Sequence, residues 1–242
     1  MQNKADTLAR LQNYILSLQG YKPAHAALQI DFGLGRIVHS FPNDSFPFSA
    51  LHEFTCNSEE ECASSGAFVG GLLSSSLNKG GIALWVGTKR HIFPPALKAF
   101  GINADQVIFV ELKKEREALW TIEEALKCAT LTTVVGEMTE LDFTESRRLP
   151  LAIEKSGVGC FLLRHRPRNS TTASTSRWHV TPLPSAVEDG IPGVCHLRWQ
   201  VDLVKVRNGR PGSWVVEWRG GRFRHATKLA TIRGEERQVK TG

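Results

Sequence analysis

The sequence lacks the features of membrane-spanning and secreted proteins. No uninterrupted apolar run approaches the roughly 18–20 residues that a membrane-spanning helix needs. The first residues, Met1 to Asp6, contain no apolar stretch of the kind found in a signal peptide. Hydrophobic residues make up 41% and charged residues 22% of the chain, which is the balance of an ordinary globular protein. We therefore expect a cytoplasmic protein with no membrane partner.

Cysteine is scarce and shows no pattern. The five cysteines, Cys56, Cys62, Cys128, Cys160 and Cys195, include no C-x-x-C pair. Their spacing suggests neither a disulfide framework nor a zinc site, and it fits a reducing compartment. Cys56 and Cys62 lie six residues apart and could form a redox pair, but we interpret them as two unrelated thiols beside the start of a helix.

A phosphate-binding loop is also missing. In a nucleotide-binding fold, the loop after the first buried strand carries the pattern G-x-x-x-x-G-K-[S/T], whose groups bind phosphates and Mg²⁺. The corresponding residues 55–66 do not contain this pattern. Three consecutive glutamates, Glu59–Glu61, instead stabilise a helix start through its dipole and would repel a triphosphate. The sequence therefore predicts no bound cofactor and no enzymatic activity.

Other catalytic and metal-binding patterns are absent from the sequence. The histidines show no H-x-x-x-H spacing, and no G-x-S-x-G motif occurs. Glu137 follows the predicted strand 132–135, where hydrolytic members of such folds place a carboxylate that orients Mg²⁺. Because Gly136 occupies the expected position and strand side chains alternate between faces, we interpret Glu137 as a solvated glutamate at the strand end. We predict no catalytic, cofactor-binding or metal-binding residues.

Strand-like and helix-like segments alternate between residues 49 and 163. The strand-like segments are rich in Val, Ile, Phe and Leu, which is typical of strands buried on both faces of a sheet. Short connections between them favour right-handed crossovers. The predicted strands are 50–55, 82–86, 106–110, 132–135 and 158–163, and the predicted helices are 63–77, 94–100, 116–128 and 145–156.

Three further segments, near 178–181, 195–205 and 213–218, have the composition of strands. The last two are joined by the turn-forming residues 206–212, which predicts a hairpin. The predicted fold class is therefore α/β, with a mostly parallel central sheet flanked by helices and with antiparallel C-terminal strands.

We divide the chain into three parts. Apolar residues at steps of three and four, such as Leu8 and Leu11, predict an N-terminal helical segment within residues 1–30. Residues 31–218 form the core domain. Residues 219–242 hold seven basic and two acidic residues with little periodicity, which indicates a basic, flexible tail.

Positive charge is concentrated in the last third of the chain. Residues 1–163 carry 15 basic and 18 acidic residues, whereas residues 164–242 carry 15 basic and 6 acidic. This asymmetry is compatible with binding of nucleic acid or an acidic protein surface. The basic stretch 164–175 leaves a predicted strand at the end where α/β sheets bind ligands. The candidate contacts with DNA or a partner are Arg164, Arg166, Arg168, Arg177, Arg207 and Arg210.

The order of these segments resembles the core of RecA. Gly35 to Val38, followed by Leu51 to Phe54, resembles the approach to its first core strand. Lys98 to Ile108 resembles a step into a later strand, and Leu162 to Arg166 lies where RecA leaves the strand before its second DNA-binding loop. Val201 to Gly209 resembles its late strand and hairpin.

Within the RecA-like superfamily, the chain is similar to the ImuA family. Trp199 to Trp214 reads W-x-V-D-L-x-K-x-R-N-G-R-P-G-x-W, which resembles that family's ending. The resemblance implies a scaffold in error-prone translesion synthesis during the SOS response to DNA damage. It implies as partners a Y-family-like protein (ImuB) and a specialised α-type DNA polymerase, with DNA and RecA as further candidates. The Glu59–Glu61 run departs from RecA, so no ATP-site residue is carried over.

Two other functions stay open. One is a divergent RecA-like ATPase acting on DNA through an unusual loop, whose turnover would depend on Glu137. The other is a cell-division inhibitor resembling the SulA family, whose partner would be a tubulin-like division protein.

Overall fold

The computed structural model describes residues 11, 30–78, 80–89, 91–168, 171–186 and 196–226. The chain forms two compact units, Met1–Asp31 and Phe32–Gly242. Apart from Leu11, the predicted N-terminal helix lies outside the described residues, as does the predicted tail from residue 227 onward. Among the helices of the described part, none has the length and apolar character needed to cross a bilayer.

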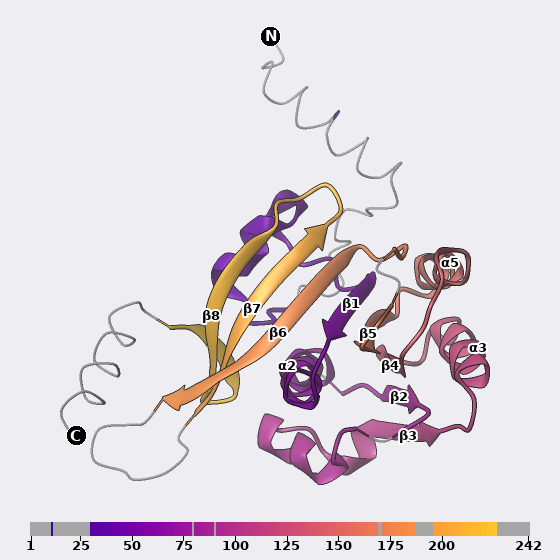
Figure 1. Cartoon of the computed structure of the whole chain (residues 1–242), viewed down its shortest axis with the longest axis horizontal. Coiled ribbons are helices and arrows are strands. Elements are labelled where there is room, and N and C mark those ends of the chain that lie inside the picture. Colours follow the sequence, from indigo (N-terminus) through magenta and orange to yellow (C-terminus); the bar gives the residue numbers. More distant parts are fainter. Residues whose placement is uncertain are drawn as a thin grey trace, which may run out of the picture. The chain divides into compact units, whose positions relative to one another are not determined.

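A nine-stranded sheet in the described residues organises the second unit (Figure 1). Its strand order is β3-β2-β4-β5-β1-β6-β7-β8-β9. The strands from β3 to β6 in this order are parallel, and those from β6 to β9 pair antiparallel, which confirms the predicted fold class. The strands are β1 (Leu51–Cys56), β2 (Ala83–Gly87), β3 (Val107–Glu111), β4 (Thr133–Met138), β5 (Gly159–His165), β6 (Ser176–Ala186), β7 (His196–Val206), β8 (Gly212–Arg219) and β9 (Arg222–His225).

The helices follow the predicted positions with three differences. The helix predicted at 63–77 begins four residues earlier, at Glu59. The predicted helix 94–100 is a 3-10 helix, and the predicted helix 145–156 is divided at Arg147 into two. The helices are α2 (Glu59–Leu77), α3 (Glu115–Leu126), α4 (Phe143–Ser146) and α5 (Arg148–Ser156), and the 3-10 helices are η1 (Gly35–Ser40), η2 (Pro42–Asp44), η3 (Pro94–Phe100) and η4 (Ala104–Gln106). Gly35–Ser40 is therefore helical, although it was compared above with the approach to a strand.

The two faces of the sheet have different cores. On one face, α3 and α5 cover an aliphatic cluster that includes Leu51 of β1 and Leu162 of β5. On the other face, aromatic side chains pack beneath α2: Phe54 of β1 stacks on Trp178 of β6, with ring centroids 5.9 Å apart. Because successive strand residues point to opposite faces, each strand contributes to both cores.

Strand β9 lies within the segment that we predicted as a tail. Gly220 and Gly221, both at positive φ, form the tight turn that joins β8 to β9. Phe223 of β9 then packs against Phe68 of α2, with ring centroids 4.7 Å apart. The sheet therefore continues to His225, beyond the predicted boundary at residue 218.

The connection between β5 and β6 crosses the sheet. Because β6 is parallel to β1 and β1 is parallel to β5, residues 166–175 must return from the carboxyl end of β5 to the amino end of β6. The amide of Thr175 donates to the carbonyl of Leu51 at that amino end (2.8 Å). Thr172 and Ser174 are buried on the way. The connection leaves β5 at its carboxyl end, as predicted, and its described residues 171–175 lead to the amino end of β6.

Candidate functional site

The carboxyl ends of β1, β4 and β5 bring several reactive side chains together. Cys56 and His165 are the last residues of β1 and β5, and the two are paired in register. Glu137 on β4 pairs with Leu163 of β5, and it points to the same face of the sheet. Cys62 lies near the start of α2, where Ser58 caps the helix by accepting from the amide of Glu61 (3.2 Å).

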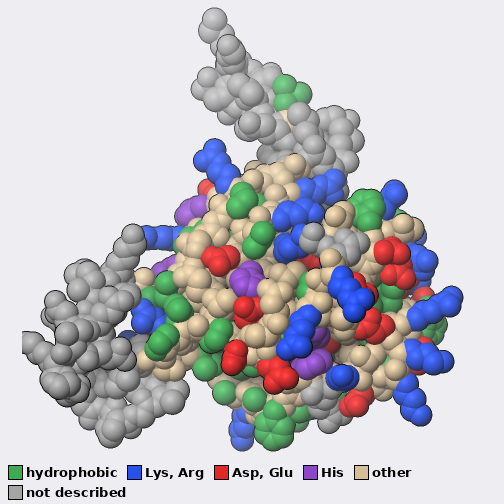
Figure 2. Space-filling model, in the orientation of Figure 1, with side chains coloured by type: hydrophobic (Ala, Val, Ile, Leu, Met, Phe, Trp, Pro, Cys, Tyr) green, Lys and Arg blue, Asp and Glu red, His purple; other side chains and the backbone are tan. Residues whose placement is uncertain are grey.

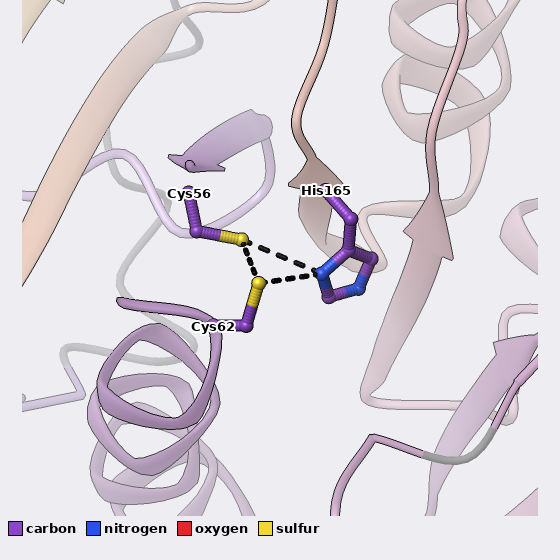
Figure 3. Close-up of side chains that lie close together, drawn as sticks. All are labelled: Cys56, Cys62 and His165. Atoms are coloured by element: carbon purple, nitrogen blue, oxygen red, sulfur yellow. Dashed lines mark hydrogen bonds between the residues drawn. The ribbon is translucent and has the colours of Figure 1, made fainter. Parts of the chain in front are cut away.

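Two thiols and an imidazole meet at this edge (Figure 3). The Sγ atoms of Cys56 and Cys62 are 2.7 Å apart. Nδ1 of His165 lies 2.9 Å from Sγ of Cys62 and 3.4 Å from Sγ of Cys56. The sulfur and nitrogen atoms therefore converge on one point, and our interpretation of the cysteines as unrelated thiols is wrong.

Glu137 is buried beside this group and does not face solvent. The indole N–H of Trp85 donates to Oε1 (2.6 Å), while Nδ1 of His91 and Nε2 of His165 lie 2.5 and 3.0 Å from Oε2. The two imidazoles stack, with ring centroids 4.0 Å apart. Glu137 is only 3% exposed, which corrects our prediction of a solvated glutamate.

The face to which Glu137 points explains that error. A Cβ on Gly136 would lie against Ile122 of α3, so Gly136 faces the aliphatic core. The alternation of the strand then directs Glu137 toward α2 and the end of β1. Glu137 therefore points to the face of the sheet on which we had expected Gly136, the face covered by α2.

The local environment raises the pKa of both thiols. Burial raises the pKa of Cys56, and its hydrogen bond to Cys62 and the nearby charges raise it further. Burial also raises the pKa of Cys62, and the charge of Glu137 raises it further. The hydrogen bond between Cys62 and Cys56 lowers this pKa, but by less.

In the connection between β1 and α2, backbone amides donate hydrogen bonds to side chains of the same segment. The carboxylate of Glu61 accepts from the amide of Asn57 (2.6 Å), and Ser58 Oγ accepts from the amide of Glu61 (3.2 Å). These are backbone donors of the kind that hold phosphates at the start of a helix. As predicted, Glu59–Glu61 occupy the first turn of α2. A phosphate here would have to displace two carboxylate or hydroxyl contacts and approach three acidic side chains.

A second polar cluster lies on the α3 and α5 face of the sheet, around Glu53 of β1. Nη1 of Arg164 lies 2.9 Å from Oε1 of Glu53, and Nη2 of Arg177 lies 2.9 Å from Oε2. Thr172 and Ser174 donate their hydroxyls to the same carboxylate (2.6 and 3.0 Å). Burial alone would raise the pKa of Glu53, but the hydrogen bonds from Thr172, Arg164 and Arg177 and the charge of Arg177 hold it below its usual value.

This cluster removes two arginines from the candidate contacts with DNA or a partner. The side chain of Arg164 is fully buried, and that of Arg177 is 14% exposed. Burial against a carboxylate leaves Arg164 no surface with which to reach a phosphate. Both residues instead join β5 and β6 to β1.

The other four candidate arginines are exposed at opposite ends of the sheet. Arg166 and Arg168 follow the carboxyl end of β5, and the side chain of Arg168 is 94% exposed. Arg207 and Arg210 lie in the β7–β8 hairpin, where the amide of Arg207 donates to Thr175 near the amino end of β1 (2.8 Å). In Figure 2, basic and acidic side chains are interspersed over much of the visible face.

The comparisons with known proteins agree with the fold. No family model matches the chain. Two curated relatives, both named Protein ImuA and both from Caulobacter vibrioides (strains NA1000 / CB15N and ATCC 19089 / CIP 103742 / CB 15), are each 34% identical over 201 residues. The matches cover 78% of this chain and 82% of each relative.

A solved structure, described as that of the RadB recombinase, superposes on this chain with a TM-score of 0.52. The match covers 76% of this chain and 93% of that one at 11% identity. At this identity the likeness is one of fold.

Proposed function

Because the chain belongs to the ImuA family, we propose that this RecA-like protein is a non-hydrolytic scaffold of a mutagenic DNA-repair complex in the cytoplasm. In this proposal it recruits a Y-family-like protein of the ImuB type and a specialised α-type DNA polymerase to damaged DNA, with RecA as a further candidate partner. Its expression belongs to the SOS response.

The observation that carries the non-hydrolytic part is the closed connection between β1 and α2. A RecA-like ATPase uses this connection to hold phosphates with backbone amides, a lysine and a hydroxyl. Here Glu61 and Ser58 occupy the amides of Asn57 and Glu61. Cys62 turns its thiol toward Cys56 and His165. These contacts favour a core that has kept its sheet and replaced its nucleotide site.

Exposed apolar side chains on α3 and α5 support the recruiting part. Trp120 of α3 is 64% exposed, and Leu151 of α5 is 61% exposed. The two helices pack together on the same face of the sheet. A large aromatic side chain that is exposed in the isolated protein is a typical anchor at a protein interface. We therefore assign partner binding to this helical face.

The first experiment combines a pull-down with an activity assay. The tagged protein is recovered from DNA-damaged cells, bound proteins are identified by mass spectrometry, and ATP hydrolysis is measured on the same preparation. We expect the Y-family-like protein and the polymerase subunit, with no turnover. ATP hydrolysis that is lost in Glu137→Gln would establish the ATPase alternative instead. A tubulin-like division protein as the main partner would establish the inhibitor alternative.

A matched pair of variants tests the helical face. Trp120→Ala combined with Leu151→Ala removes two exposed side chains, so we expect the fold to be retained and partner recovery to fall at least about tenfold. Phe93→Ala is the control, because Phe93 is 70% exposed and lies outside α3 and α5. Equal recovery with both variants would exclude this face as the partner surface.

A further inference from the structure

We propose that Cys56, Cys62 and His165 form a zinc site at the carboxyl edge of the sheet, in which Glu137 orients the imidazole. This proposal does not depend on the scaffold function, because it rests only on the donor atoms and their surroundings.

The donor set is the first argument. Two cysteine sulfurs and one imidazole nitrogen are ligands that Zn²⁺ prefers, and three protein ligands with an open fourth position are typical of non-structural zinc sites. The ligand atoms of the three residues lie within 4.8 Å of one another. They come from two neighbouring strand ends and the first turn of a helix, which are rigid elements.

The positions of the ligand atoms are compatible with a tetrahedral ion after a small rearrangement. Zn–S bonds of about 2.3 Å and Zn–N bonds of about 2.0 Å place tetrahedral ligand atoms about 3.5–3.8 Å apart. The sulfurs are 2.7 Å apart, so they must separate by about 1 Å. Cys62 is only partly buried, so rotation of its side chain can supply this movement.

The partner of the other imidazole nitrogen is the second argument. A zinc-binding histidine commonly donates its second ring N–H to a carboxylate, which fixes the tautomer and the ring orientation. Nε2 of His165 lies 3.0 Å from Oε2 of Glu137, so this N–H donates to Glu137 and the lone pair of Nδ1 faces the thiols. Trp85 donates to the other carboxylate oxygen and holds Glu137 in place.

The charge balance is the third argument. On binding, each thiol releases one proton to solvent, and the two thiolates neutralise the charge of Zn²⁺. A water molecule can complete the coordination at the fourth position.

A second group of residues, His91, Glu137 and His165, also has its ligand atoms within 4.8 Å of one another. It lacks sulfur, and its histidine His91 is 41% exposed. In our proposal Glu137 serves as the partner of His165 and is not a ligand. The two arrangements differ in one observable, because only the site proposed here contains thiolate–metal bonds.

The first measurement is metal analysis of the full chain, purified with reductant and without chelator. We expect one zinc ion per chain. After zinc removal, titration with Co²⁺ is expected to give an intense thiolate-to-cobalt charge-transfer band and the visible bands of a tetrahedral ion. Binding of Co²⁺ without a charge-transfer band would overturn the proposal, as would protein that binds neither metal.

Variants then locate the site. We expect Cys62→Ser to lose stoichiometric zinc, and Glu137→Gln to retain a site that is about 10–100-fold weaker. Cys128→Ser is the matched control, because Cys128 is an exposed thiol whose partner is Thr130. Zinc content in Cys62→Ser equal to that of the control contradicts the proposal. A disulfide between Cys56 and Cys62 in zinc-replete, reduced protein also contradicts it. If Cys62→Ser fails to fold, the cobalt spectrum of the unaltered chain decides.

Discussion

His52 is a buried imidazole whose hydrogen bonds require the neutral form. The indole of Trp178 donates to Ser176 Oγ (2.7 Å), and Ser176 Oγ lies 2.6 Å from Nδ1 of His52. Nε2 of His52 lies 2.9 Å from the carbonyl of Pro47, to which it donates. Ser176 therefore donates to Nδ1, and each donor in this series of hydrogen bonds, from Trp178 to Pro47, has one acceptor. Burial lowers the pKa of His52 to about 4, partly opposed by the carbonyl of Pro47.

This arrangement makes the stability depend on pH. The unfolded chain takes up a proton at His52 below about pH 6.5, whereas the folded chain does so only near pH 4. The stabilisation is therefore present above pH 6.5 and is lost as the pH falls toward 4. Between pH 7 and pH 5, we expect His52 to lower the free energy of unfolding by about 2 kcal/mol.

The measurement is urea unfolding at both pH values. His52→Gln cannot titrate in this range, so its loss of stability between pH 7 and pH 5 should be smaller than that of the unaltered chain by about 2 kcal/mol. His39→Gln is the control, because the His39 side chain is 66% exposed. An identical pH dependence for His52→Gln and the unaltered chain would show that His52 does not stay neutral.

Glu53 gives a second prediction at the scale of one residue. Its carboxylate is buried and lies against the guanidinium groups of Arg164 and Arg177. Glu53→Gln removes the carboxylate that both guanidinium groups contact and leaves Arg164 with the more distant carboxylate of Glu140 (4.0 Å). We therefore expect a loss of about 3–5 kcal/mol in the free energy of unfolding. Glu117→Gln, on an exposed pair with Lys114, is expected to change it by less than about 0.5 kcal/mol. Comparable urea midpoints for the two variants would contradict the prediction.

At the scale of elements, the packing of β9 on α2 can be tested with two glycines of one helix. A Cβ on Gly71 would overlap the ring of Phe223 in β9, whereas a Cβ on Gly66 would meet nothing within 4 Å. Alanine is favoured over glycine in a helix by about 1 kcal/mol. Gly66→Ala should therefore stabilise the protein by about that amount, and Gly71→Ala should destabilise it by about 1–3 kcal/mol through overpacking.

Thermal unfolding of the two variants checks this prediction. Because both substitutions are the same and lie in α2, the difference between them reports the contact of α2 with Phe223 of β9 and Trp218 of β8. If both variants gained stability, Phe223 would not be packed against α2.

Local sequence patterns predicted most of the strands and helices, but not all of their ends. The ends of β1 to β5 were predicted to within about three residues, because apolar runs bounded by polar residues mark buried strands. β9 was missed because Arg222–His225 alternates charged side chains with Phe223, and only the preceding glycine pair signals a hairpin. The predicted helix 145–156 was wrong in its first part. A capping box at Asp142 starts a separate short helix, and that helix ends at Arg147.

The candidate site was not predicted, for a different reason. Cys62 and His165 are 103 residues apart, and they meet only because β5 lies beside β1 in the sheet. Spacing rules for zinc sites describe ligands that are close in sequence, so they gave no signal here. The missing phosphate loop could be read directly, because its pattern is local. The contacts that the side chains of residues 56–62 make depend on the strand order, which is not local.

At the scale of the whole molecule, the topology separates the basic residues that the sequence grouped together. The amide of Arg166 donates to the carbonyl of Cys56 at the carboxyl end of β1 (2.7 Å), whereas Arg207 lies near its amino end. Six strand residues span about 20 Å. One short segment of single-stranded DNA therefore contacts either Arg166 and Arg168 or Arg207 and Arg210. We expect it at Arg166 and Arg168, because the carboxyl end is where α/β sheets bind ligands.

This separation predicts how charge reversal affects DNA binding. We expect Arg166→Glu with Arg168→Glu to weaken binding of single-stranded DNA and to reduce the slope of log affinity against log salt by about 1.4, since each lost phosphate contact removes about 0.7. Arg207→Glu with Arg210→Glu makes the same change in net charge at the other end of the sheet, and we expect it to leave that slope unchanged. Fluorescence anisotropy at several salt concentrations measures both. Equal reductions would indicate that only net charge attracts the DNA, and no reduction in either variant would exclude both surfaces.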